Sequence, residues 1–113
     1  MEEELRWARA GGLFDGEGHI HKKNACLDIG MCDLDVIVWL KETFQINNRI
    51  CEHPQKSGKI LYRLYVTGKA NVKRVLTRML PYLGQRRSAV AQAKIDWIDN
   101  SPYSNYKEKN ATA

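Results

Sequence analysis

The residues best suited to chemistry lie close together near the amino terminus. Two carboxylates, Asp15 and Glu17, stand among glycines in the stretch Ala10 to Gly18, where a predicted helix ends. A carboxylate beside a glycine at a helix end is well placed to bind a hard divalent cation such as Mg²⁺, which commonly takes few protein oxygens and completes its shell with phosphate and water. One carboxylate alone makes a poor site. A second copy of Glu17 would complete it if two chains met along this segment.

The element that must position Glu17 is a helix predicted over Glu3–Asp15, opened by acidic residues and carrying apolar residues on one face. A neighbouring face is made of small residues at every fourth position, a pattern suited to close contact between helices. Glycine costs a helix about 0.5–1 kcal/mol relative to alanine, so this face calls for a compensating contact. We interpret it as the contact with a two-fold copy, formed by Ala8, Gly11, Gly12, Asp15 and Gly16. Two alternatives stay open: the glycines only cap and fray one short helix, and Asp15 is a solvated acid rather than a capping residue or a residue that supports the metal ligand from behind.

The rest of the chain alternates between periods of two and 3.6, which predicts the order helix, strand, strand, helix, strand, strand, helix, helix. The strands are predicted around His19–His21, Ala25–Met31, Arg49–His53 and Ile60–Thr67, and the later helices from Asp33 to Phe44, over Gly68–Leu83 and over Ser88–Ile98, with Gly84–Arg87 as a connection. The last helix is predicted to pack through Ala89, Val90, Ala93 and Trp97. The fold class is therefore α+β, with a four-stranded antiparallel sheet, helices on one face and the other face open.

The open face is predicted to be polar and largely basic. Its outward residues are His19, His21, Lys23, Asp28, Arg49, His53, Arg63, Tyr65 and Thr67, and Arg87 joins them from the predicted connection. A solvated surface is the plain interpretation of such a face. The same side chains also donate to phosphates and to base edges, so we interpret the face as a surface that reads a nucleic-acid groove.

Composition bounds these interpretations. The 113 residues fit one domain, predicted over residues 1–99, followed by a polar tail over residues 100–113. A net charge of +5 favours an anionic partner, although charge alone is weak support. No apolar run is long enough for a membrane span, and the acidic start does not resemble a secretory signal. Three cysteines without CxxC spacing are expected to be free thiols in a reducing compartment, in the cytoplasm, a nucleoid or an organelle matrix.

Other kinds of site find less support in the sequence. The spacing of the candidate zinc ligands His19, His21, Cys26, Cys32, Cys51 and His53 matches no common zinc pattern. No serine or cysteine lies in a nucleophile motif, and Gly-Glu-Gly lacks the lysine and hydroxyl residue of a phosphate-binding loop. No small-molecule cofactor is therefore expected.

The stretch Ala10 to Gly18 resembles the nine-residue motif of the LAGLIDADG homing endonucleases. The resemblance extends across Leu5 to Ile98, because that family repeats helix–strand–strand around a saddle-shaped antiparallel sheet. The stretch Val75 to Arg87 also resembles the family's third helix and the basic turn that follows it.

The resemblance implies a site-specific double-strand DNA endonuclease, associated with intron or intein mobility, that acts as a homodimer on a partly palindromic site with Mg²⁺ or another divalent cation such as Mn²⁺. The sheet would lie in the major groove. Carried over by position, Glu17 is the metal ligand, joined by the backbone carbonyl of Gly16. Arg86 corresponds to the basic residue that polarises the site, and Gln85 or Arg87 takes that role if the turn differs by one residue.

Three departures from the family pattern favour an alternative function. Ala10 and Gly11 replace leucine and alanine at the start of the motif, and Met31 stands where the family often places glutamine. Arg86 replaces the usual lysine, and a permanently charged guanidinium cannot act as a base. The alternative is a DNA- or RNA-binding relative that does not cleave, such as a regulator or a splicing helper.

Overall fold

The computed structural model of the chain describes residues 2–101, and the predicted order of elements is confirmed. The elements are α1 (Glu3–Glu17), β1 (Gly18–Ile20), β2 (Cys26–Met31), α2 (Leu34–Phe44), β3 (Cys51–Pro54), β4 (Ile60–Thr67), α3 (Lys69–Met79), a short 3₁₀ turn η1 (Leu80–Tyr82) and α4 (Gln85–Asn100). Of the predicted tail, Asn100 ends α4, and residues 102–113 lie outside the described residues.

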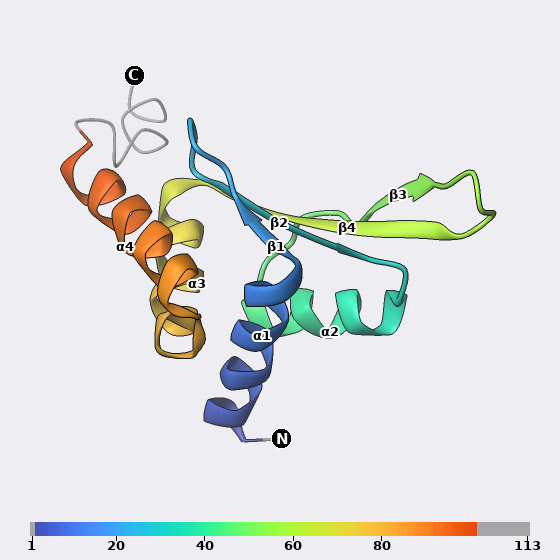
Figure 1. Cartoon of the computed structure of the whole chain (residues 1–113), viewed down its shortest axis with the longest axis horizontal. Helices are drawn as coiled ribbons and strands as arrows, with labels where there is room; N and C mark the ends of the chain where they lie inside the picture. The colour runs from blue at the N-terminus through green and yellow to red at the C-terminus, as the bar shows by residue number, and fades with distance from the viewer. Residues whose placement is uncertain (1, 102–113) are drawn as a thin grey trace.

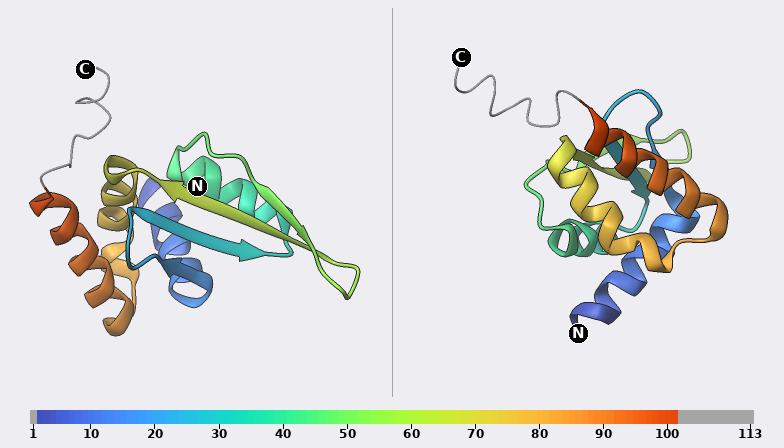
Figure 2. Two further views of the ribbon diagram at one scale, coloured as in Figure 1. Left: turned by 90° about the horizontal axis from the view of Figure 1, so that it is seen from above. Right: turned by 90° about the vertical axis from the view of Figure 1, so that its left-hand side faces the viewer.

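The four strands form one antiparallel sheet in the order β1-β2-β4-β3. Helices α1 and α2 lie beneath one face of this sheet, and within residues 2–101 no element covers the opposite face (Figure 1). Helix α4 packs against α3 at the end of the sheet away from the β3–β4 hairpin (Figures 1 and 2). The predicted α+β architecture, with helices on one side and an open face on the other, is confirmed. None of the helices in residues 2–101 is both long and apolar enough to cross a membrane.

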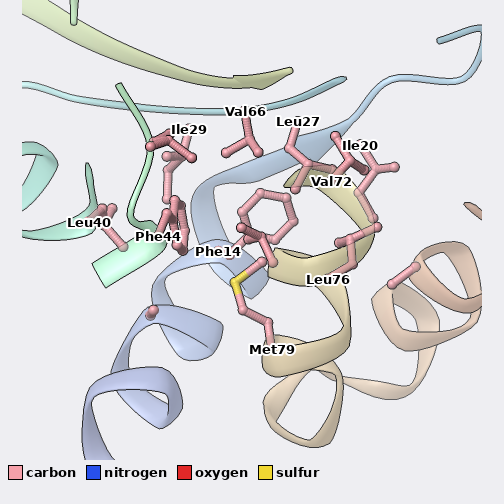
Figure 3. Close-up of a cluster of buried hydrophobic side chains, with 14 of the residues drawn as sticks. Phe14, Ile20, Leu27, Ile29, Leu40, Phe44, Val66, Val72, Leu76 and Met79 are labelled. Atoms are coloured by element: carbon pink, nitrogen blue, oxygen red, sulfur yellow. The ribbon is translucent and has the colours of Figure 1, made fainter. Parts of the chain in front are cut away.

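The hydrophobic core fills the space between the sheet and the helices. Phe14 from α1 lies among aliphatic side chains of the sheet and of α3 (Figure 3). Phe44 from α2 stacks on Trp7 with ring centroids 5.8 Å apart. The period-two pattern identified the inward faces of the central strands correctly, because Leu27, Ile29, Leu64 and Val66 are all buried; the partly buried Tyr62 and Ile50 pack against the same core. This core fixes α1 against the sheet and so fixes the position of the helix end.

Two predicted boundaries were wrong where function is concerned. Helix α1 continues to Glu17 instead of ending at Asp15, so Gly16 and Glu17 form its last turn. The segment predicted as a connection contributes only Gly84, because Gln85 to Arg87 already belong to the first turn of α4. The helix start was not predicted because Gln85, Arg86 and Arg87 are polar and give no apolar periodicity.

The predicted packing face of α4 was also wrong. Ala89, Val90, Ala93 and Trp97 are exposed, whereas Ala91, Lys94, Ile95 and Ile98 are buried. Lys94 explains the error: its ammonium donates to the carbonyl oxygens of Lys22 and Asn24, at 3.2 and 2.9 Å, so a charged residue occupies a core-facing position. Burial lowers the pKa of Lys94. A prediction based on the positions of apolar residues treats a lysine such as Lys94 as exposed.

Candidate functional site

The carboxyl end of α1 delivers Glu17 to the surface. Glu17 is exposed, and its side chain makes no hydrogen bond or ion pair within residues 2–101. The next residue, Gly18, is buried against the core: a Cβ there would lie 2.3 Å from Cδ1 of Phe14. Only glycine lets the chain pass this close to the ring as it turns from α1 into β1. The turn therefore leaves the carboxylate of Glu17 available for a ligand.

Two contacts hold this end of α1 to the start of α4. Asp15 accepts a hydrogen bond from the backbone N–H of Gly84, the residue before α4, at 2.8 Å. The Arg87 guanidinium donates to the carbonyl oxygens of Gly18 and Asp15, at 2.5 and 3.3 Å, and lies over the Phe14 ring. A cation at these carbonyls also complements the negative end of the α1 dipole. Asp15 therefore ties the end of α1 to the residue before α4 and is not a solvated acid.

The three residues that could take the place of the family's basic catalytic residue, Gln85, Arg86 and Arg87, fall into two environments. Gln85 and Arg86 are exposed, and neither side chain has a hydrogen bond or ion pair among residues 2–101. Arg87 is half-buried, and its Nε is buried with no hydrogen-bond partner in the part of the chain that the structure describes. Arg87 therefore serves the fold around Glu17, while the Arg86 side chain is available for a ligand.

This difference gives a stability prediction. Replacing Arg87 by methionine is expected to lower the free energy of unfolding by about 1–3 kcal/mol, because the carbonyls of Asp15 and Gly18 lose their donor. The matched change of Arg86 to methionine is expected to stay within about 0.5 kcal/mol of wild type, since Arg86 is exposed. Urea unfolding followed by circular dichroism at one protein concentration measures both. Equal effects would contradict the role given to Arg87.

The small-residue face of α1 divides into two parts. Gly12 and Gly16 are exposed, and a Cβ on either would meet nothing within 4 Å. Leu5, one turn before Ala8 on this face, is 60% exposed, and Ala8 itself is half-buried, so the face is open on both sides of Ala8. Gly11, predicted on the same contact, instead faces inward, where a Cβ would lie 2.7 Å from Cβ of Tyr82. Gly11 therefore serves packing inside one chain, and the open face consists of Leu5, Ala8, Gly12 and Gly16.

A metal site within one chain would be incomplete. Among residues 2–101, no three histidine, cysteine or acidic side chains gather in a way that could hold a metal ion. Asp15 is bonded to Gly84, and Arg87 uses the carbonyls of Asp15 and Gly18 but not that of Gly16. The carboxylate of Glu17 and the carbonyl of Gly16 are the oxygens that fit a hard cation here. They become a two-sided site only if a second copy adds its own pair.

The open sheet face brings most of the predicted outward residues together. The exposed ones are His19, Lys23, Arg49, His53 and Thr67, and the half-buried ones are His21, Arg63 and Tyr65. Asn48, which the sequence did not single out, donates to the Thr67 hydroxyl at 3.0 Å. Its place in a loop before β3 carries no periodic signal, which is why it was missed.

Asp28 departs from the prediction, because its carboxylate is buried on this face. It is only 6% exposed and is paired with His21 and with Arg63, each at 2.6 Å. Desolvation, and then the charge of Asp28, raise the pKa of the neighbouring Cys26 thiol. Asp28 is therefore a support beneath the outer side chains and not itself an outer contact. Met31, at the end of β2, is half-buried opposite Tyr62.

Known proteins share both the sequence pattern and the fold. The family described as "LAGLIDADG-like domain" matches residues 8–79. Two crystal structures of the homing endonuclease I-CvuI are similar. One is a complex with the I-CreI target (C1221) in the presence of 2 mM Mg, with the DNA not cleaved. It matches with a TM-score of 0.65 and 16% sequence identity, and the match covers 88% of this chain and 69% of that chain. The other is a complex with its own target (Sro1.3) in the presence of 2 mM Ca. It matches with a TM-score of 0.65 and 15% sequence identity, and the match covers 91% of this chain and 71% of that chain. Comparison with curated proteins finds no match.

Proposed function

The chain belongs to the LAGLIDADG-like domain family, and on that premise we propose that it is a site-specific double-strand DNA endonuclease that acts as a homodimer. One observation carries the proposal: the exposed Glu17 ends the same helix whose small-residue face is open. Two such faces can meet at a two-fold axis without any side chain at Gly12 or Gly16 to displace. The two copies of Glu17 then lie near that axis.

The site's own residues have defined tasks in this arrangement. Glu17 and the carbonyl of Gly16 would hold Mg²⁺ or Mn²⁺ against a DNA phosphate. When bound, the cation would activate water and stabilise the leaving oxygen of an in-line displacement. Arg87 and Asp15 fix the helix end that presents Glu17. Arg86, exposed at the start of α4, would stabilise charge on the phosphate without acting as a base.

The open sheet face supports the proposed partner, a double-stranded DNA. Its histidine, arginine, tyrosine and threonine side chains can donate to phosphates and to base edges in a major groove, which is wide enough to admit strands. A two-fold dimer presents the same face twice. The proposed site is accordingly partly palindromic.

A second candidate function is DNA or RNA binding without cleavage. Met31 favours it, because a half-buried thioether at the end of β2 cannot orient a water molecule as an amide would. The exposed guanidinium of Arg86 also offers no base. In that case the same sheet face would serve a regulator or a splicing helper.

Selection of a binding site from random duplex DNA, followed by cleavage of the selected duplex, tests the proposal. We expect recovery of a partly palindromic site that is cut on both strands with Mg²⁺ or Mn²⁺ and left intact in EDTA, because the cation is needed to activate water. Tight, salt-sensitive binding without scission in either metal would support the second candidate. Recovery of no preferred site would contradict both.

A further inference from the structure

A cluster of three side chains on the open sheet face has Asp28 at its centre. Asp28 lies on β2, His21 directly follows β1, and Arg63 lies on β4. His21 Nε2 and Arg63 Nη1 each approach a different oxygen of Asp28 at 2.6 Å. The side chain of Asp28 is 8% exposed, whereas those of His21 and Arg63 are 32% and 31% exposed. The carboxylate is thus covered by two side chains that still reach solvent.

Gly30 lets Arg63 reach this carboxylate. Gly30 is the direct partner of Arg63 across the β2–β4 pair and lies two residues from Asp28 on the same face. A Cβ on Gly30 would lie 3.3 Å from Cζ of Arg63, so the guanidinium crosses the strand where a side chain is missing. Glycine inside a strand weakens it, and close approach by another group is a known reason for its presence.

The bonds to Asp28 restrict what the two outer side chains can offer. An ionised carboxylate only accepts hydrogen bonds, so His21 must carry a proton on Nε2, which leaves its Nδ1 for another partner. Arg63 uses Nη1 on Asp28 and keeps the N–H groups of Nη2 and Nε. Two adjacent donors of a guanidinium match the O6 and N7 acceptors of guanine in the major groove.

We propose that Asp28 is a positioning residue for sequence recognition, holding Arg63 in place to read guanine, with His21 fixed beside it. The inference rests on the proposed function, in which this face meets DNA. A carboxylate on such a face opposes phosphate attraction, so its presence weakens general binding. Its contribution is to fix the orientation of Arg63 and His21, which would otherwise sample several rotamers.

The test measures base preference separately from general affinity. Asp28→Asn keeps the shape of the side chain and removes its charge. We expect the ratio of specific to non-specific affinity to fall about tenfold, with the preference for one guanine flattened in each half-site. Affinity for random duplex at fixed salt is expected to stay equal or rise, because one negative charge is lost. A residue that only stabilised the fold would lower both affinities together.

Two further variants make the test independent of Asp28 itself. Gly30→Val leaves Asp28 intact and displaces the guanidinium of Arg63, so it should flatten the preference for the same base. Glu52→Gln removes an exposed carboxylate from β3 outside the cluster and should leave the preference unchanged. Melting curves establish that each variant is folded at the assay temperature, and if Asp28→Asn is not, Gly30→Val decides.

The outcomes separate this inference from the proposed function. If the wild-type chain selects a DNA motif, and Asp28→Asn or Gly30→Val selects it with the same base preference, the role of Asp28 is overturned while DNA recognition stands. If the wild-type chain selects no motif, the proposed function fails and the inference fails with it.

Discussion

Replacing Glu17 by glutamine is expected to reduce DNA cleavage by at least about a hundredfold while leaving the fold and DNA affinity close to wild type. Glu17 is exposed and has no partner among residues 2–101, so the change removes no contact inside the chain. A neutral amide keeps an oxygen but loses the charge that holds a hard cation. In a dimer the loss occurs twice, once on each side of the axis.

The measurement is cleavage of the selected duplex under single-turnover conditions with Mg²⁺, alongside a binding titration in EDTA. Glu42→Gln is the matched control, because Glu42 is an exposed glutamate on α2, away from the end of α1. It should cut like wild type. Cleavage by Glu17→Gln at the wild-type rate would remove Glu17 from the metal site.

The second large effect is expected at Gly12. Gly12→Leu should convert the proposed dimer to a monomer and abolish the proposed double-strand cleavage, because a leucine on the open face would hold two helices apart. Within one chain a Cβ at this position meets nothing within 4 Å, so the monomer should fold as before. Sedimentation velocity across a range of concentrations measures the association.

Gly11→Ala is the control that separates packing inside the chain from contact between chains. A Cβ at Gly11 would lie 2.7 Å from Cβ of Tyr82, so this variant should lose stability, by about 1–3 kcal/mol, through a clash within one copy. A Gly12→Leu protein that sediments like wild type, or that loses stability as Gly11→Ala does, would contradict the assignment of the open face.

The sequence predicted the parts of this fold that depend on local periodicity. Period two in β2 and β4 identified Leu27 and Leu64 as inward residues, and the four-residue spacing of Gly12 and Gly16 identified the open face of α1. The buried face of α4 could not be predicted in this way. Lys94 is buried because two carbonyl oxygens from a distant loop accept its hydrogen bonds, and such partners are set by tertiary packing.

For the candidate site as well, the sequence indicates the residue types and the local pattern, but not the contacts set by tertiary packing. Glu17 follows from residue type and neighbouring glycines, both visible in the chain. Arg86 and Arg87 differ in role because Arg87, and not Arg86, lies on the side of α4 that faces the end of α1, and the sequence does not show which side that is. The pairing of Asp28 with Arg63 joins residues 35 positions apart, so an outward position on a strand did not reveal a buried carboxylate.

The contact that Arg63 of β4 makes across Gly30 with Asp28 has a consequence for any attempt to change the proposed DNA specificity. If Arg63 reads a base as proposed, it cannot be exchanged alone, because its removal would leave Asp28 as a poorly compensated buried charge. A substitute for Arg63 therefore requires a matching substitute for Asp28. Gly30, where a Cβ would lie 3.3 Å from Cζ of Arg63, limits the size of any replacement that must cross it. These positions are therefore best varied together in a library.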